Sequence, residues 1–234
     1  MQPSDALRAR VAIPRGLVMC AALWVFLSWI LIFGWHPPVQ SQAASYGPSL
    51  NLLYVSVGIG IVVGWPLLRL SGRPVPRPAM QAALDGFALF MLLQIVVWPL
   101  RLVTAWTLSR TLALDAAIAA AIAMTGALLA LSAGRAEPAP RASAMATFLL
   151  LAMAAPLARW FGGLDAPPWP VESISPPALL SRFSAPKPLD PDAADFRVLE
   201  TAGWVAAALW IAVPAALALR ARRAVSHPNG DPLS

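Results

Sequence analysis

Four side chains that could bind a ligand or take part in chemistry interrupt the apolar stretches in the middle of the chain: Gln94, Trp98, Arg101 and Asp115. Gln94, Trp98 and Arg101 are four and three residues apart, so on a helix they share one face. Polar groups inside apolar helices often mark binding or coupling sites. We therefore expect a ligand or coupling site here, with Asp115 as its fourth member.

Arg101 also has a simpler interpretation, which we favour, as an anchor at the membrane interface. Long basic side chains extend from a buried backbone to the headgroups, and tryptophans such as Trp98 gather at that level. A charge at the bilayer centre costs at least ~2.5–3.5 kcal/mol, and the cost falls towards the interface. At the same level, Asp115 is expected to contact Arg110 or Arg101.

The composition places these residues in a membrane protein. Of the 234 residues, 59% are hydrophobic and 12% are charged, whereas soluble domains carry about 25% charged residues. A helix of about 20 apolar residues crosses a bilayer. The sequence predicts an all-α bundle of six transmembrane helices, at residues 17–33, 50–68, 86–106, 113–133, 143–161 and 202–219, with a tight turn at 109–114.

The distribution of basic residues predicts the orientation of this bundle. Eleven of the seventeen basic residues fall on one side if both termini are cytoplasmic, which follows the positive-inside rule. Five tryptophans then line the opposite interface: Trp35, Trp106, Trp160, Trp169 and Trp204. A single lysine against sixteen arginines indicates a GC-rich bacterial genome. We expect a multi-pass protein of the bacterial inner membrane with the bilayer as its first partner.

The chain divides into five segments on this reading. Residues 1–15 form a cytoplasmic lead, 16–161 hold helices 1–5, 162–201 form an external loop, 202–223 hold helix 6, and 224–234 form a tail. The external loop has eight prolines and six acids against three bases. Ser175 is expected to cap a short helix over 176–183 that lies on the membrane or dips into it. Asp190 or Asp192 is expected to begin a helix that runs into helix 6.

Small residues indicate where the helices pack closely. Ser56, Gly60 and Gly64 form a small-xxx-small ladder, which lets two helices approach. The alanine-rich stretch 113–133 has little side chain with which to face lipid, so it is expected inside the bundle. Pro99 is expected to kink its helix and Pro156 to break its helix, because proline removes a backbone donor.

Many kinds of chemistry are missing from the sequence. It has no phosphate-binding loop, no HExxH and no GxSxG motif. One cysteine and two histidines predict neither a disulfide framework nor a metal site, and we expect no cofactor. His36 is more simply a solvated loop residue than a haem or quinone ligand. The acids lie near span ends, which argues against a proton pump, and the basic residues flank spans and do not indicate nucleic acid.

The six-helix layout, with both termini inside and an external helical loop before the last span, is similar to that of ABC-2-type permeases. The resemblance is one of topology along the chain, and no motif accompanies it. The first cytoplasmic loop departs from the pattern, since it is rich in proline and has no amphipathic coupling helix. The resemblance implies a membrane subunit of a transport or export complex, with other membrane subunits or a cytoplasmic ATPase as partners.

Two alternatives remain at this stage. A non-catalytic scaffold or assembly factor would use the glycine ladder and the external loop as docking surfaces, and it ranks almost level with the transport subunit. An enzyme acting on lipid-linked substrates at the outer face ranks third, and we do not expect catalysis. Such an enzyme would use acids and arginines whose spacing in the sequence does not predict an active-site geometry: Arg101, Arg110, Asp115, Arg159, Asp190 and Asp192.

Overall fold

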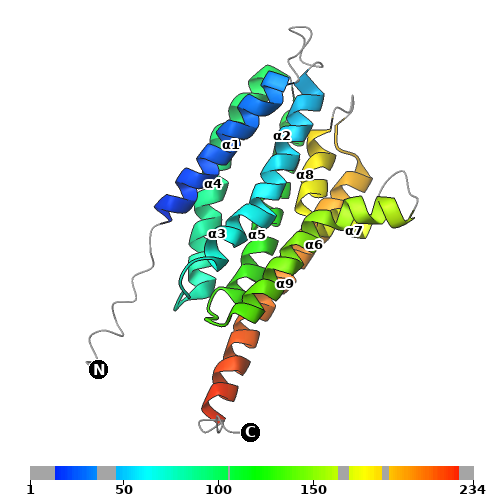
Figure 1. Ribbon diagram of the computed structural model, residues 1–234. Coiled ribbons are helices and arrows are strands. Elements are labelled where there is room, and N and C mark those ends of the chain that lie inside the picture. Colours follow the sequence, from blue (N-terminus) through cyan, green and yellow to red (C-terminus); the bar gives the residue numbers. More distant parts are fainter. Residues whose placement is uncertain (1–13, 36–45, 105, 163–168, 186–189, 227–234) are drawn as a thin grey trace.

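In the computed structural model, the described residues are 14–35, 46–104, 106–162, 169–185 and 190–226, and they form helices with no strand among them. Six of these helices are long and apolar enough to cross a membrane, which confirms the predicted all-α membrane bundle. The six are α1 (Arg15–Trp35), α2 (Gly47–Ile59) continued through η3 (Gly60–Gly64) and α3 (Trp65–Leu70), α4 (Pro78–Thr104), α5 (Leu108–Ser132), α6 (Pro138–Gly162) and α9 (Ala193–Ser226). Figure 1 shows them as one bundle.

Two predicted details are wrong. The turn at 109–114 does not exist, because α5 already begins at Leu108. Thr107 caps this helix: its hydroxyl oxygen accepts a hydrogen bond from the backbone N–H of Arg110 at 3.2 Å. In addition, α6 is not broken at Pro156 but continues as a helix through it, as α4 does through Pro99. Proline is tolerated within membrane helices because local adjustments and neighbouring groups can satisfy the freed backbone carbonyl.

The centre of the bundle is α5, as its alanine content predicts. Of its apolar stretch, 67% is buried, and α4, α6, α8 and α9 all pack against it. Gly126 lies between two indoles, with Trp65 on one side and Trp210 on the other. Trp210 also donates through Nε1 to the carbonyl of Ala123 at 2.9 Å. Small side chains on α5 thus let large ones from α3 and α9 fill the interior.

The second span contains a π-helical segment, η3, between two α-helical pieces. Such segments widen one turn of a helix and often occur at functional sites. Here, η3 passes directly into α3, where Trp65 is fully buried. The widened turn lies beside α6 and α5.

Two short helices, α7 (Trp169–Ile174) and α8 (Pro176–Ser184), precede α9. The helix predicted after Ser175 is confirmed as α8. It is buried against α2 and α5, and Figure 1 shows it beside α2 within the bundle. The hydroxyl of Ser175 makes no capping bond and has no partner.

The direction of α8 follows from its contacts with α2. Ser184 Oγ lies 3.0 Å from Asn51 Oδ1, near the start of α2. At the other end of α8, a Cβ on Gly58 would lie 2.7 Å from the Cα of Pro177. Gly58 is eleven residues after the first residue of α2, which corresponds to ~16 Å along a helix. The start of α8 therefore reaches about half the depth of the bundle, and the helix runs antiparallel to α2.

The two ends of the bundle differ in charge. We call the end where α1, α4 and α6 begin the basic end, because arginines flank the helices there: Arg15, Arg69, Arg73, Arg77, Arg135 and Arg141. The end where α8 terminates is the α8 end. Helix α9 continues past its apolar stretch, which ends at Leu219, and Figure 1 shows its last turns extending beyond the other helices.

Candidate functional site

A polar cluster of side chains from α2, α4 and α5 lies near the α8 end, with Tyr54 buried and Trp98 exposed at its edge. Its members are Tyr54 on α2, Gln94 and Trp98 on α4, and Asp115 on α5. Asp115 is seven residues after Leu108, and Tyr54 is seven residues after Gly47, so both lie ~10 Å below the helix ends. We call these four residues the Asp115 cluster.

The side chains of α4 surround the carboxyl group of Asp115. Trp98 Nε1 donates to Gln94 Oε1 at 2.8 Å, which directs the amide nitrogen of Gln94 away from Trp98. Gln94 and Trp98 are close enough to act on the Asp115 carboxyl as hydrogen-bond donors. By strict geometry, however, Asp115 Oδ1 and Gln94 Nε2 are both buried without a partner.

Tyr54 completes the cluster from α2. Its side chain is 1% exposed, its hydroxyl has no hydrogen-bond partner, and it lies within the electrostatic reach of Asp115. Its ring centroid is 5.9 Å from that of Trp106, over which the guanidinium of Arg110 stacks at 5.6 Å. Sequence reasoning missed Tyr54, because nothing in the primary structure relates α2 to Asp115.

Unpartnered buried polar atoms are uncommon in folded proteins, and each costs about 1–3 kcal/mol. Six side-chain atoms of this kind occur in the described part of the chain, and three belong to the Asp115 cluster: Tyr54 Oη, Gln94 Nε2 and Asp115 Oδ1. A carboxylate oxygen and a phenol oxygen accept hydrogen bonds, and an amide nitrogen donates. Together they can hold a small, positively charged or hydrogen-bonding group.

The predicted Arg–Asp contact is not formed. Arg110 points towards α8, where its Nε donates to the carbonyl of Phe183 at 3.1 Å and its Nη2 donates to the carbonyl of Ala185. These carbonyls end α8, and a guanidinium stabilises the negative end of a helix. The burial of α8 beside α5 thus supplies Arg110 with acceptors that the sequence alone did not place there. Arg101 Nε instead approaches the carbonyl of Trp106 at 3.4 Å.

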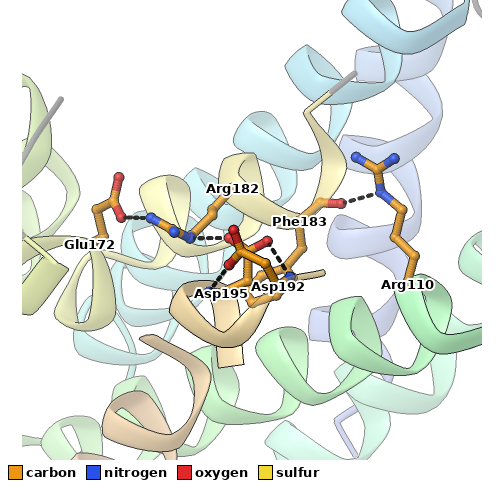
Figure 2. Close-up of polar contacts among 6 residues, drawn as sticks. All are labelled: Arg110, Glu172, Arg182, Phe183, Asp192 and Asp195. Carbon is orange, nitrogen blue, oxygen red and sulfur yellow. Dashed lines mark hydrogen bonds and ion pairs between the residues drawn. The ribbon is translucent and has the colours of Figure 1, made fainter. Parts of the chain in front are cut away.

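A second polar network holds α7, α8 and α9 together at the α8 end (Figure 2). Arg182 of α8 forms ion pairs with Glu172 of α7 and with Asp195 of α9, the latter at 2.6 Å between Nε and Oδ1. Burial lowers the pKa of Arg182, but the bonds to Asp195 and Glu172 outweigh this effect, so its pKa is raised and the side chain stays charged. We call these three residues the Arg182 network.

Asp195 also belongs to the start of α9. Its backbone N–H donates to Asp192 Oδ1 at 2.8 Å, and the N–H of Asp192 donates to Asp195 Oδ2 at 3.2 Å. This reciprocal pair is a capping box. It confirms the prediction that Asp192 starts a helix running into the last span. Asp190 instead accepts a hydrogen bond from the hydroxyl of Thr107.

A third network lies towards the basic end and has a structural role. Asp85 is completely buried and accepts hydrogen bonds from Gln81 at 2.8 Å, from Trp65 at 3.3 Å and from two guanidinium nitrogens of Arg69. Arg69, expected in a loop, is part of α3. With its acceptors occupied, Asp85 joins α3 to α4 and leaves little capacity for a ligand.

The small-residue ladder meets different surroundings at each position. Ser56 Oγ lies 2.8 Å from Ser28 Oγ of α1, and a Cβ on Gly60 would lie 2.9 Å from the indole nitrogen of Trp24. At Gly64, a Cβ would meet nothing within 4 Å. Ser56 and Gly60 therefore face α1, whereas Gly64 faces open space.

The remaining candidates do not converge on one site. Arg159 is exposed on α6, and His36 lies outside the described residues. No group of three or more histidine, cysteine and acidic side chains that would suit a metal ion occurs in the described segments. The acids and arginines considered for an outer-face enzyme are thus distributed between helix caps, the α8 contacts and the Asp115 cluster.

Comparison with protein-family models, with curated proteins and with solved structures finds no match for this chain. The protein is a multi-pass membrane protein on the strength of its own six apolar helices.

Proposed function

We propose that this protein is the membrane subunit of a transport or export system, and that the Asp115 cluster binds the positively charged group of the transported or coupling species. The chemical class is a monovalent cation or a protonated amine. The observation that carries the proposal is the proximity of two acceptor oxygens, Tyr54 Oη and Asp115 Oδ1, both buried and without a partner.

The depth of the cluster supports a binding role. At ~10 Å below the helix ends, an acidic group is costly in the membrane unless something compensates its charge. The three fully buried acids have that compensation, whereas Asp115 is half-buried: Asp85 pairs with Arg69, and Glu172 and Asp195 pair with Arg182. Among the described ion pairs none involves Asp115, so a cation from outside the chain is the simplest counter-charge.

The neighbouring short helix supports the same proposal. Transporters commonly build their sites beside discontinuous helices that end within the membrane. Helix α8 begins at about half the depth of the bundle and contacts α2 and α5, which supply Tyr54 and Asp115. A movement of α8 relative to these two helices would therefore change the shape of the cluster.

The basic end supports a cytoplasmic docking surface and, with it, the inner-membrane orientation. Arg15, Arg73 and Arg77 are exposed there, and α9 extends past its apolar stretch on the same side. Excess arginine marks the cytoplasmic side of a membrane protein. A cytoplasmic ATPase with an acidic surface is the partner that this end would fit.

The direct test is charge movement across a membrane that contains the purified, full-length protein. Proteoliposomes adsorbed on a solid support are exposed to concentration jumps of Na⁺, K⁺, H⁺ and methylammonium. We expect a transient current with at least one of these cations in the wild type and its loss in Asp115→Asn. Glu137→Gln is the matched control, since it neutralises an exposed acid at the basic end. Absence of any current in the wild type, or an unaltered current in Asp115→Asn, would refute the binding role.

Co-purification from the native host in mild detergent tests the subunit role separately. A stoichiometric ATPase is the expected companion. Recovery of other membrane proteins without an ATPase would instead favour the scaffold alternative, for which the exposed side of α1 offers a docking face.

A further inference from the structure

A groove runs between α1 and α4. It consists of two consecutive hollows of about 290 and 320 Å³. Both are lined by Val25 and Leu92, so one continues into the other. The first hollow extends towards the basic end as far as Leu17 and Cys20, and the second extends the other way to Trp29 and Leu100. We call the two together the α1 groove.

The groove has a buried floor and an exposed rim. Val57, Ile61 and Trp65 on the floor are buried, whereas Trp24 and Leu68 on the rim are exposed. The groove is therefore open on one side to whatever surrounds the helices. In a membrane, the surrounding medium at this depth is hydrocarbon.

Two glycines of η3 line this groove. A Cβ on Gly64 would meet no atom within 4 Å, and a Cβ on Gly60 would meet only the indole of Trp24. Gly64 is nevertheless only partly exposed. The absence of a side chain at Gly64 thus leaves a hollow within the outline of the bundle. It does not allow a close contact with another helix, because no atom of another helix lies within 4 Å of the Cβ position of Gly64.

We propose that the α1 groove binds one acyl chain of an anionic phospholipid, with the phosphate headgroup at the basic end. Apolar cavities do not hold water, because water there finds too few polar partners. Both hollows approach the size of small-molecule pockets, but they are arranged end to end. An elongated apolar groove that opens sideways into a bilayer fits an alkyl chain better than a compact ligand.

The positive charge at the basic end of the bundle favours an anionic headgroup there. Arg15 is the first residue of α1, lies within two turns of Leu17 and Cys20, and is exposed. Arg69 is also near this end, but Asp85 already neutralises it. An exposed guanidinium at the headgroup level binds a phosphate well, and this argument does not depend on the proposed transport function.

The test uses the full-length protein in nanodiscs that contain a trace of phosphatidylglycerol with a diazirine in one acyl chain. After photo-crosslinking, peptide mapping should show stronger labelling of the groove residues on α1, η3 and α4 than of residues on the exposed side of α1. Gly64→Leu places a side chain in the empty space, so we expect crosslinking in the groove to fall several-fold. Gly203→Leu is the matched control, because a Cβ there also meets no atom within 4 Å, but on the exposed surface of α9.

Two further measurements distinguish binding of the acyl chain from recognition of the headgroup. Ala21→Phe fills the groove from the α1 side and should reproduce the loss if Gly64→Leu fails to fold. With phosphatidylethanolamine carrying the same photoreactive chain, groove labelling should be several-fold weaker, and Arg15→Gln should remove this difference. Labelling that is spread evenly over α1, or that survives both groove-filling variants, would overturn the proposal. An equal yield from the two headgroups would overturn its anionic part.

Discussion

Helices α1 and α5 have similar lengths and are both strongly apolar, yet they occupy opposite environments. Of the apolar stretch of α5, 67% is buried, against 6% for α1. Large side chains on α1 are exposed, among them Met19, Leu31 and Trp35. Small side chains dominate α5, and four other helices pack against it.

This comparison shows that hydropathy determines whether a helix inserts into the membrane, whereas side-chain size determines where that helix lies within the bundle. Lipid tails are as apolar as leucine, so there is no hydrophobic force between helices in a membrane, and close packing decides association. Alanine and glycine on α5 permit such packing, and bulky residues on α1 leave hollows behind them. The two proposed binding sites differ in the same way. The Asp115 cluster includes a residue of the closely packed α5, whereas the α1 groove is lined by the exposed α1.

The largest expected effect is on the packed side, at Arg182. Arg182→Met would leave Glu172 and Asp195 without their counter-charge, and losing one partner of a buried ion pair costs about 3–5 kcal/mol. We expect a clear fall in the thermal unfolding midpoint of the detergent-purified protein. Arg197→Met, at an exposed position on α9, should have little effect. Equal midpoints for the two variants would mean that the Arg182 network does not hold α8 in place.

A leucine pair compares the two helices directly. Leu129 on α5 is 1% exposed and Leu31 on α1 is 63% exposed. Leu129→Ala should destabilise the protein by about 2–5 kcal/mol through the cavity it creates, and Leu31→Ala should stay within about 0.5 kcal/mol. Unfolding midpoints measured in the same detergent provide the check. A similar loss from Leu31→Ala would show that α1 is packed against something other than lipid or detergent.

A glycine pair within one span tests the packing of α8. A Cβ on Gly58 would lie 2.7 Å from backbone of Pro177, which cannot rotate away, whereas Gly64 has open space. Gly58→Val should therefore cost about 1–3 kcal/mol, and Gly64→Val should cost much less, although both add a β-branched residue to the same continuous helix. Proteolysis of the segment around α8 should increase only in Gly58→Val. Protection in both variants would argue that α8 is not held against α2.

The smallest effect is expected where α1 meets α2. Ser28 Oγ and Ser56 Oγ lie 2.8 Å apart, and hydrogen bonds between membrane helices are worth about 0.6 kcal/mol on average in double-mutant cycles. The cycle Ser28→Ala, Ser56→Ala and the double variant should give a coupling energy of that size. A coupling above about 2 kcal/mol would exceed the range of such bonds and show that α1 is bound more firmly than its exposure suggests.

Several local features were predictable because their causes are local. Apolar runs of about 20 residues identify spans, a serine followed by two prolines identifies the start of α8, and an aspartate before a helical segment identifies the cap of α9. Three of the four members of the predicted site, Gln94, Trp98 and Asp115, do lie together. Their proximity follows from the short turn between α4 and α5, which makes these helices antiparallel neighbours.

Other features depend on contacts between distant segments. Tyr54 joins Asp115 from α2, Arg110 binds the end of α8 seventy-three residues later in the sequence, and Asp85 is bonded by Trp65 and Arg69 of α3. No spacing rule connects these positions. Arg110 meets its acceptors because α8 is buried between α2 and α5, and the close approach of α8 to α2 depends on the absence of a side chain at Gly58.

The sequence by itself determined that the chain crosses a membrane six times as helices, since hydrocarbon leaves backbone groups no partner outside a helix and apolar length is a one-dimensional property. Only the tertiary structure decided which helix is central, where α8 lies, which arginine meets which acid, and where polar atoms remain unpartnered. Those outcomes depend on the fit of side-chain volumes between segments far apart in the chain, and hydropathy carries no information about that fit.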